Sequence, residues 1–357
     1  MILYKHEQPI AQKAVYVKEI HMKENETNTR LTINDVAREL GLSTTTISRA
    51  ISGKGRISNK TRERVLEYIN EHNYRPNIIA KGLADKRTYN ICVNIPSDAN
   101  IDETPFFQCC LMGICEAASS RDYDVVVTTT TDTDITYLKR VINNHKVDGV
   151  ILTRSLINDI AAKFLKENGI SYVLIGDDTD KNVIKIDSDH LSGCAQLTSY
   201  MIMSGCRKLA FLCGSHEHIV NRNRYNGFLK GCEQNGMIPS KECIYLDVIN
   251  DSQVAHSVDK ALKSGCDCII CSDDLICTRV LRRLDEINVS VPGDIKVASF
   301  YNSSALENHT PPVTALTINV KELGVAAGKT LIEMINGQEV SEMTLIDYEI
   351  VLKGSTK

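Results

Sequence analysis

Apolar residues near the N-terminal end of the chain recur at the spacing of short helices. Positions 33, 36, 37 and 40 form one apolar helical face, Thr32 precedes them as an N-cap, and Gly41 follows as a residue that tolerates a left-handed backbone. Ser43 offers the next N-cap two residues later, before a second helix whose apolar residues are Ile47, Ala50 and Ile51. Ser58 starts a third helix, whose inward-facing residues are Val65, Leu66 and Ile69. Two short helices joined by a tight turn that contains glycine predict a helix-turn-helix.

The polar face of the second helix is suited to binding nucleic acid. It consists of Thr44, Thr45, Ser48 and Arg49 and contains no acidic residue. Short hydroxyl side chains can approach phosphates, and a guanidinium can donate two hydrogen bonds to guanine. The pattern alone also fits a generic three-helix packing module, so both interpretations stay open at this point.

From residue 89 onward, short apolar runs alternate with helical patterns. The runs expected to be strands are residues 91–95, 124–128, 149–152, 173–175, 209–212, 268–271 and 296–300. The segments expected to be helices are residues 107–119, 135–143, 157–168, 191–203, 225–235, 254–264 and 275–288. The alternation predicts parallel sheets, and because the series is too long for one sheet we expect two α/β lobes. Ligands of such folds bind beyond the carboxyl ends of the strands.

These patterns divide the chain into four parts. Residues 1–30 are polar and lack sustained periodicity, so we expect a disordered leader, with Met22 as the alternative native start to Met1. Residues 31–75 form the helix-turn-helix domain, residues 76–88 a hinge linker, and residues 89–357 the two-lobed domain. Pro76 prevents the third helix from continuing, and residues 78–83 can form only one or two turns, too few to be stable alone.

Charge is divided unevenly between these parts. Residues 31–88 hold 11 Lys or Arg and 6 Asp or Glu, a net charge of +5, whereas residues 89–357 carry −10. A basic head on an acidic body favours a polyanionic partner for the head alone. The sequence contains no secretory signal and no run of about 18 apolar residues. We therefore expect a cytoplasmic protein without a membrane partner.

The chain contains 13 cysteines, which we expect to be reduced thiols in that compartment. Cys266, Cys268 and Cys271 are close enough in sequence to suggest a metal cluster. However, they lie in an apolar run and lack a second Cys or His pair at zinc spacing. We therefore expect no metal site, and buried cysteines that act as small hydrophobic residues here and at Cys109 and Cys110.

A series of ordered motifs runs through the head and the body. In the head they are TINDVARELGLSTTTISRAISGKGRIS and TRERVLEYINEHNYRPN. In the body they are TPFF at 104–107, VDGVIL at 147–152, RYNGF at 224–228, SDD at 272–274, VPGDIKVASF at 291–300 and PPVTALTIN at 311–319. From about residue 31 to the C-terminal end, the chain thus resembles the LacI/GalR (lac repressor-like) family of bacterial transcription regulators. The resemblance implies an all-α helix-turn-helix head and a two-lobed α/β effector domain of the periplasmic-binding-protein type (type I).

The same resemblance implies a sequence-specific DNA-binding repressor whose affinity for its operator is controlled by a small effector, often a sugar. The domain of residues 89–357 would bind the effector and form a homodimer. No heptad repeat follows the last strand-like segment, DYEIVLK, so we expect a dimer and no tetramer. A purine-responsive regulator and a soluble ligand-binding protein are the alternatives, and no cofactor is implied.

By position, the resemblance assigns DNA-binding roles in two places. In the second helix, the base-reading residues would be Thr44, Thr45 and Arg49, and the phosphate contacts would be Ser43, Thr46 and Ser48. In the linker, the DNA-binding residues would be Asn77, Ala80 and Leu83. Leu83 matches the family's leucine that wedges between base pairs in the minor groove, with Ala80 packed beneath it.

The resemblance also assigns effector contacts to Phe106, Phe107, Arg224 and Asp274. Arg224 would donate two hydrogen bonds to the effector, although an ion pair with a carboxylate is its structural alternative. Asp274 would accept hydrogen bonds from effector hydroxyls and also cap the helix that follows. The two phenylalanines fit the floor of a cleft and a place in the core equally well.

Three residues depart from the family pattern. Gly82 stands where a better helix former is usual. Glycine in a helix interior costs about 1 kcal/mol of stability relative to alanine. Asp273 replaces a common Asn and Tyr301 a common Asp. Both lie near the expected cleft, so the effector need not be a common one.

Paired carboxylates raise the question of an enzyme. Asp177–Asp178 and Asp273–Asp274 are adjacent pairs, but neighbouring side chains on one element diverge and do not converge on one point. The sequence contains no P-loop, nucleophile elbow or metal-ligand spacing. We therefore expect no enzyme.

Overall fold

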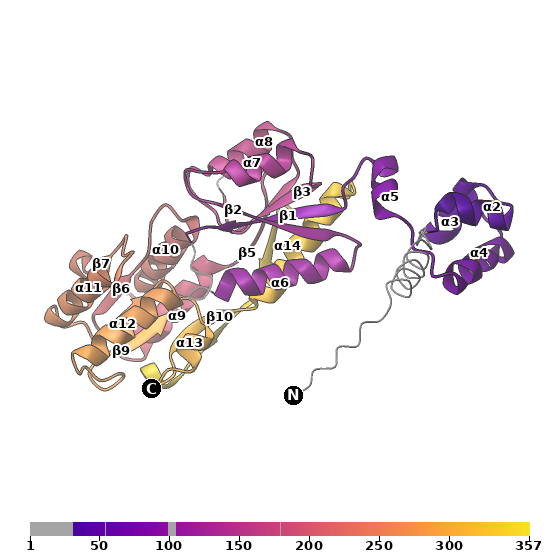
Figure 1. Ribbon diagram of the computed structural model, residues 1–357. Helices are drawn as coiled ribbons and strands as arrows, with labels where there is room; N and C mark the ends of the chain where they lie inside the picture. The colour runs from indigo at the N-terminus through magenta and orange to yellow at the C-terminus, as the bar shows by residue number, and fades with distance from the viewer. Residues whose placement is uncertain (1–30, 54, 99–104, 179) are drawn as a thin grey trace, which may run out of the picture. The chain divides into compact units, whose positions relative to one another are not determined.

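The structure, a computed structural model, describes residues 31–53, 55–98, 105–178 and 180–357. The chain divides into two compact units, a head that ends at Lys86 and a body of Arg87–Lys357 (Figure 1). The predictions for residues 1–30, including the leader and the start at Met22, lie outside the described residues.

The head consists of the three predicted helices and a linker helix. They are α2 (Ile33–Leu40), α3 (Thr44–Ser52), α4 (Asn59–Glu71) and α5 (Ile78–Asp85). Thr32, Ser43 and Ser58 cap the first three, each accepting the backbone N–H of the residue three positions later. Gly41 ends α2 with a φ of 64°, a left-handed conformation that glycine adopts without strain. The helix-turn-helix prediction is confirmed.

A small apolar core holds α2, α3 and α4 together. Val36, Ile47 and Val65 are fully buried in it. The inward orientation predicted for Leu66 is wrong, because its side chain is 40% exposed. The buried face of α4 runs instead through Val65 and Ile69, which are four residues apart and so lie on one side of a helix.

The body contains two lobes, each with its own sheet and helices. In lobe 1 the strands are β1 (Asn90–Pro96), β2 (Asp124–Thr130), β3 (Gly149–Leu152), β4 (Tyr172–Ile175), β5 (Ile184–Ser188) and β11 (Met343–Ile346). Its helices are α6 (Pro105–Ser119), α7 (Thr136–Asn143), α8 (Ile160–Glu167) and α14 (Val320–Ile335). In lobe 2 the strands are β6 (Leu209–Leu212), β7 (Ile244–Tyr245), β8 (Cys268–Cys271), β9 (Lys296–Ser299), β10 (Thr314–Ile318) and β12 (Tyr348–Val351). Its helices are α9 (His190–Met203), α10 (Ile219–Gln234), α11 (Asp251–Lys263), α12 (Asp274–Glu286) and α13 (Ser304–Glu307).

Both sheets have six strands, and most neighbouring strands within each sheet run parallel to each other. The strand order is β11-β5-β4-β3-β1-β2 in lobe 1 and β12-β10-β9-β8-β6-β7 in lobe 2. The neighbouring strands are parallel except for β12, which runs antiparallel to β10. Figure 1 shows helices packed against each sheet. The predicted fold class, a helical head and a two-lobed α/β body, is confirmed.

The chain crosses between the lobes after β5, after β10 and after β11. As a result, α14 packs on α6 in lobe 1, although it follows strands of lobe 2. Glycines let these two helices approach closely. A Cβ at Gly113 would lie 2.1 Å from the carbonyl oxygen of Lys321, and a Cβ at Gly324 would lie 2.1 Å from that of Cys110. Larger residues at these two positions would push the helices apart.

Three helix starts differ from the predictions by three residues or more. One is that of α11, which begins at Asp251 and not at residue 254, because Asn250 caps it. α8 begins at Ile160 and not at residue 157, because Asp159 caps it and the residues before it pair with a loop of lobe 2. α10 begins at Ile219 and not at residue 225. Its first turns bury the polar residues Asn221 and Arg224, which hide the apolar periodicity of the helix.

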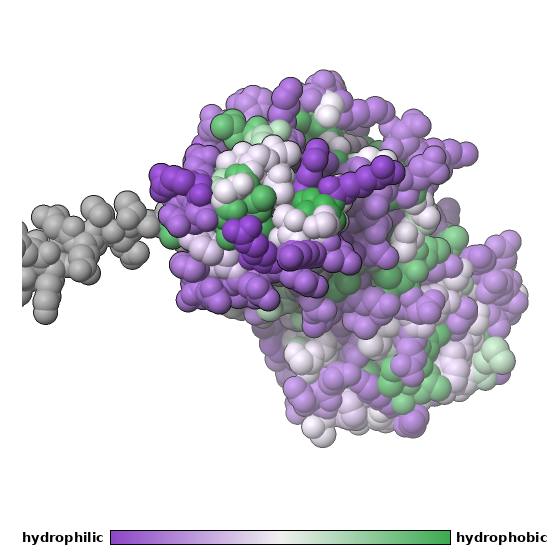
Figure 2. All heavy atoms as spheres, turned by 90° about the vertical axis from the view of Figure 1, so that its right-hand side faces the viewer, coloured by the Kyte–Doolittle hydropathy of each residue, from purple (hydrophilic) through white to green (hydrophobic). Residues whose placement is uncertain are grey.

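Within the described ranges, no helix is long and apolar enough to cross a membrane. The face drawn in Figure 2 is mostly hydrophilic, and its apolar side chains form separate small patches.

Cys266, Cys268 and Cys271 are buried as predicted, and so is Cys110. The prediction of a buried Cys109 is wrong, because it lies on the exposed side of α6.

Candidate DNA interface and effector cleft

Helix α3 buries one side and exposes polar side chains on the other. Ile47 and Ala50 are buried in the core of the head. Thr45, Ser48 and Arg49 are exposed, whereas Thr44 and Thr46 are half-buried. The exposed side therefore offers hydroxyls and one guanidinium without a carboxylate, which suits the approach to a polyanion.

The two ends of α3 are held by local contacts. At its start, Ser43 Oγ accepts the backbone N–H of Thr46 at 3.1 Å and lies 2.9 Å from Thr46 Oγ1. Near its end, the Arg49 stem lies against Gly55, which has a φ of 90°. A Cβ at Gly55 would lie 3.1 Å from Arg49 Cδ. Glycine at this position therefore leaves room for the arginine stem.

The linker helix α5 exposes the side chains that the resemblance assigns to DNA. Leu83 is 85% exposed, Ala80 is exposed as well, and Asn77 is exposed just before the helix. A large apolar side chain so open to water gains free energy from any partner that covers it.

The four candidate effector residues lie together in the body. Phe106 and Phe107 come from α6 in lobe 1, whereas Arg224 on α10 and Asp274 on α12 come from lobe 2. Tyr301, which follows β9 in lobe 2, lies among them. Its ring is 6.1 Å from the Phe106 ring and meets it edge-on, and Arg224 Cζ lies 6.0 Å from the centre of the tyrosine ring. The Phe106 and Phe107 rings are 5.3 Å apart.

Asp274 and Arg224 place two charged groups in a largely buried environment. Their residues are 4% and 8% exposed. Burial raises the pKa of Asp274 to about 6; the nearby carboxylate of Asp273 adds to the rise and Arg224 opposes it. Arg224 Nε has no hydrogen-bond partner among the described residues. Because a buried donor without a partner is costly, this N–H is available to an acceptor oxygen of a ligand.

The N-cap of α12 is Asp273 and not Asp274, so the capping role predicted for Asp274 is wrong. The Asp273 carboxylate accepts the backbone N–H of Ile276 at 2.9 Å. Asp274 is the first residue of the helix, and its carboxylate adds to burial in raising the pKa of Tyr301.

Polar contacts join the two lobes beside this cluster. Asp177 in lobe 1 accepts hydrogen bonds from Lys185 Nζ at 3.3 Å and from Asn223 Nδ2 at 3.4 Å. Asn223 belongs to α10, so the second of these bonds crosses from lobe 1 to lobe 2.

A short backbone bridge also connects the lobes. The Ile157 N–H donates to the carbonyl oxygen of Glu217 at 3.1 Å, and the Ile219 N–H donates to that of Ser155 at 3.3 Å. The two segments run antiparallel. These contacts link the two lobes directly.

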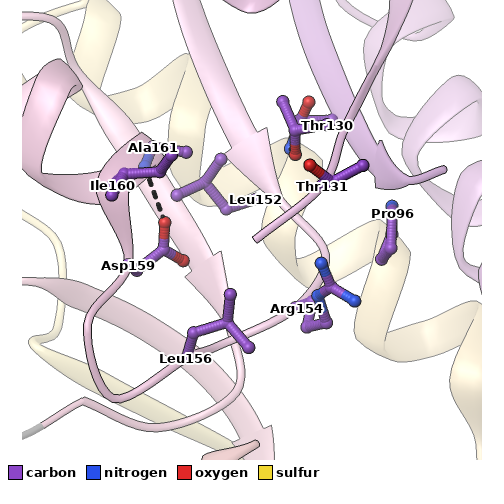
Figure 3. A pocket seen from close by; sticks show the side chains of 10 residues that line it. Pro96, Thr130, Thr131, Leu152, Arg154, Leu156, Asp159, Ile160 and Ala161 are labelled. Carbon is purple, nitrogen blue, oxygen red and sulfur yellow. Dashed lines mark hydrogen bonds between the residues drawn. The ribbon is translucent and has the colours of Figure 1, made fainter. Parts of the chain in front are cut away.

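A small polar hollow lies at the carboxyl ends of β1, β2 and β3 in lobe 1 (Figure 3). Arg154 lines it and forms ion pairs with Asp98 at 2.9 Å and with Asp132 at 2.6 Å. Asp159 turns toward the first turn of α8, where it accepts the N–H of Ala161. The free volume of the hollow is about 10 Å³, enough for about one water molecule. The hollow therefore does not accommodate a sugar in this conformation.

The sequence patterns do not identify Arg154, Lys185 or Asn223 as cleft residues. Arg154 follows β3 by two residues, so it could have been identified by the rule that ligands bind beyond the carboxyl ends of strands. Lys185 lies within β5 and Asn223 in the second turn of α10, and neither has such a signal.

Two parts of the chain match the descriptions of known protein families. Residues 32–77 match the description "Bacterial regulatory proteins, lacI family", and residues 198–356 match a periplasmic binding protein-like domain. The HTH-type transcriptional regulator MalR of Staphylococcus xylosus is 31% identical over 337 residues, which cover 91% of this chain and 98% of MalR. Catabolite control protein A of the same organism is 24% identical, covering 92% of this chain and 99% of that protein.

Solved structures share the fold. The transcriptional regulator CelR in complex with cellobiose has a TM-score of 0.70 and 24% identity, covering 91% of this chain and 100% of CelR. The lac repressor dimer bound to operator and the anti-inducer ONPF has a TM-score of 0.72 and 22% identity, covering 92% and 99% of the two chains. At these identities, the likeness concerns the fold alone.

Proposed function

Because the chain belongs to the lacI family of bacterial regulatory proteins, we propose that it is a sequence-specific DNA-binding repressor controlled by a sugar or sugar derivative. The observation that carries this proposal is the pairing of two features in one chain. The head exposes an acid-free helix, and the body buries Arg224 and Asp274 beside aromatic rings. The relatives reported above are transcriptional regulators and not enzymes.

In the head, α3 would lie in the major groove. Thr44, Thr45 and Arg49 would contact base edges, since the guanidinium can pair with guanine O6 and N7. The phosphate contacts would be Ser43, Thr46 and Ser48. The linker contacts would be Asn77, Ala80 and Leu83, with the exposed Leu83 inserted between base pairs of the minor groove.

A homodimer would place two copies of α3 in successive turns of the major groove on an operator with two-fold symmetry. The solved lac repressor is a dimer on its operator, which supports this arrangement by analogy of fold. We place the protein in the cytoplasm, where its DNA partner lies.

In the body, the effector would bind between the lobes. Arg224 Nε would donate to a ring or hydroxyl oxygen, Asp274 would accept from hydroxyls, and Phe107 would pack on the apolar face of the sugar ring, with Phe106 beside it. The CelR structure holds cellobiose, and a neutral sugar fits this donor and acceptor pair. Binding there would change the closure of the lobes and hence the linker.

Two measurements test this proposal. Selection from random duplexes followed by fluorescence anisotropy is expected to yield a palindromic operator that the protein binds far more tightly than random DNA. A thermal-shift screen of sugars, sugar phosphates and nucleobases is expected to find a sugar that raises the melting temperature, since a ligand of the native state stabilises it. The same sugar is expected to change operator affinity. Equal affinity for operator and random DNA would contradict the proposal.

The linker helix yields a separate prediction. Leu83→Ala is expected to weaken operator binding while leaving sugar affinity intact, because the wedge is lost and the cleft is not touched. Gly82→Ala is expected to strengthen operator binding by up to about 1 kcal/mol, since the backbone of α5 is helical at this position and alanine favours a helix. Both variants are measured by anisotropy against the same operator.

Amide exchange checks the cause of these effects. The amides of residues 78–85 are expected to be better protected in the operator complex than in the free protein, because an eight-residue helix is marginal alone. Equal protection in both states would show that α5 does not fold on DNA.

A further inference from the structure

Tyr301 belongs to lobe 2 by sequence and to lobe 1 by packing. It follows β9, a strand of the lobe 2 sheet. Its side chain is 8% exposed and belongs to the buried apolar cluster of lobe 1, together with Cys110 on α6 and Leu323 on α14. The residue before it, Phe300, is buried in the cluster of lobe 2. The chain therefore inserts one aromatic ring of lobe 2 into the other lobe.

The ring of Tyr301 also contacts groups that we propose for the effector. Arg224 Cζ lies 6.0 Å from its centre, within the range of a cation–π interaction. Phe106 meets it edge-on at 6.1 Å, the preferred geometry of an aromatic pair. An effector that lies beside Phe106 and receives hydrogen bonds from Arg224 must therefore compete with this ring.

Other contacts also join the lobes. Among the described residues, the polar ones include the two backbone hydrogen bonds of the bridge at residues 155–157 and 217–219, the side-chain bond from Asn223 to Asp177, and the pair of His190 Nε2 with Asp187 Oδ1 at 3.3 Å. Ile318 is partly buried and packs on the apolar clusters of both lobes. Each such polar bond contributes little net free energy, because water competes for the same groups when the lobes separate. Burial of an aromatic ring contributes more, because it removes a large apolar surface from water.

From these contacts we infer that Tyr301 is a built-in ligand of the cleft. Its ring holds the lobes closed in the absence of effector, and a sugar must displace it or share its place between Arg224 and Phe106. The closing role rests on the contacts alone, whereas the competition with a sugar rests on the proposed function. Tyr301 thus sets which effectors the cleft accepts.

Amide hydrogen exchange in the full-length protein tests the closing role. The N–H groups of Ile157 and Ile219 report closure directly, since each donates to the opposite lobe. Tyr301→Ala is expected to raise their exchange rates at least about tenfold, and Tyr301→Leu to raise them less, because leucine refills part of the volume. Tyr301→Phe is expected to leave the rates near those of the wild type. Millimolar phenol is expected to restore slow exchange in Tyr301→Ala, since it fits the cavity left by the ring.

A second tyrosine of lobe 2 provides the matched control. Tyr245 is partly buried and packs on the apolar cluster of its own lobe. Tyr245→Ala is expected to leave the exchange of Ile157 and Ile219 unchanged. If Tyr301→Ala and Tyr301→Leu exchanged at wild-type rates, or if the control accelerated exchange equally, the inference would be overturned.

Sugar titration separates this inference from the proposed function. Tyr301→Ala is expected to bind the sugar found in the thermal-shift screen more tightly than the wild type, by about tenfold, because no ring has to be displaced. A weaker or equal affinity would refute the competition. If no sugar bound either protein while the two amides still responded to Tyr301→Ala, the effector assignment would fail and the closing role would stand.

Discussion

Arg49→Ala is expected to weaken binding to the selected operator by about 1–3 kcal/mol for each half-site, and to leave binding to random DNA nearly unchanged. The expectation follows from the position of Arg49 on the exposed side of α3, with its stem supported by Gly55. A guanidinium held in this way can pair with the two acceptors of guanine, and alanine cannot. The variant should also tolerate substitution of one base pair in each half-site that the wild type rejects.

Anisotropy titrations on operator and random duplexes, at two salt concentrations, check this result. Arg64→Ala is a suitable control, because it removes the same charge from an exposed position on α4. The control is expected to change both affinities slightly and by similar factors. If Arg49→Ala lowered specific and random binding equally, Arg49 would be a phosphate contact and would not read a base.

Local signals predict the head well because its elements are fixed by short-range chemistry. Thr32, Ser43 and Ser58 cap helices since their hydroxyls lie three residues before free N–H groups, and Gly41 ends α2 since it adopts a left-handed backbone without strain. Such features depend on neighbours in sequence. For the same reason, buried apolar runs such as β3, β6 and β8 are predicted with their observed bounds.

Other elements depend on partners that are distant in sequence. β5 reads IKIDS, and its Lys185 and Asp187 are buried, with Asp177 and His190 as their polar partners. β7 has two residues and β11 joins lobe 1 only because the chain returns to it near its end. Hydrophobic periodicity contains no information about such pairing, so β5, β7, β10 and β11 are not predicted.

The candidate cleft likewise combines residues that the sequence identifies with a packing arrangement that it does not. The resemblance identifies Arg224, Asp274 and the two phenylalanines, and the structure brings them together. The insertion of Tyr301 into lobe 1 follows from three crossings of the chain, which no local pattern encodes. The sequence signal for this insertion is that Tyr301 stands where the family pattern usually has Asp.

Asp274→Asn is expected to stabilise the body at neutral pH. Burial raises the pKa of Asp274 from 3.8 to about 6, so between about pH 4 and pH 6 the folded body keeps a proton that the unfolded chain has released. The contribution of Asp274 therefore favours the folded state below about pH 4 and is lost as the pH rises through 6. At pH 7 the buried charge costs about 3 kcal/mol, since one pKa unit corresponds to about 1.4 kcal/mol. Asparagine removes this cost.

The same substitution is expected to abolish the response to the sugar, because it replaces one acceptor oxygen by an N–H donor and removes the charge that strengthens hydrogen bonds from hydroxyls. Arg224→Ala is expected to abolish it as well, but with the opposite effect on stability, since Asp274 then loses the cation that opposes its desolvation. Thermal unfolding between pH 4 and pH 8, followed by circular dichroism, checks both signs. Asp189→Asn is a matched control, because Asp189 caps α9 and asparagine caps equally well. Unfolding of Asp274→Asn with the pH dependence of the wild type would show that Asp274 carries no buried charge, and wild-type sugar affinity in both cleft variants would place the effector site elsewhere.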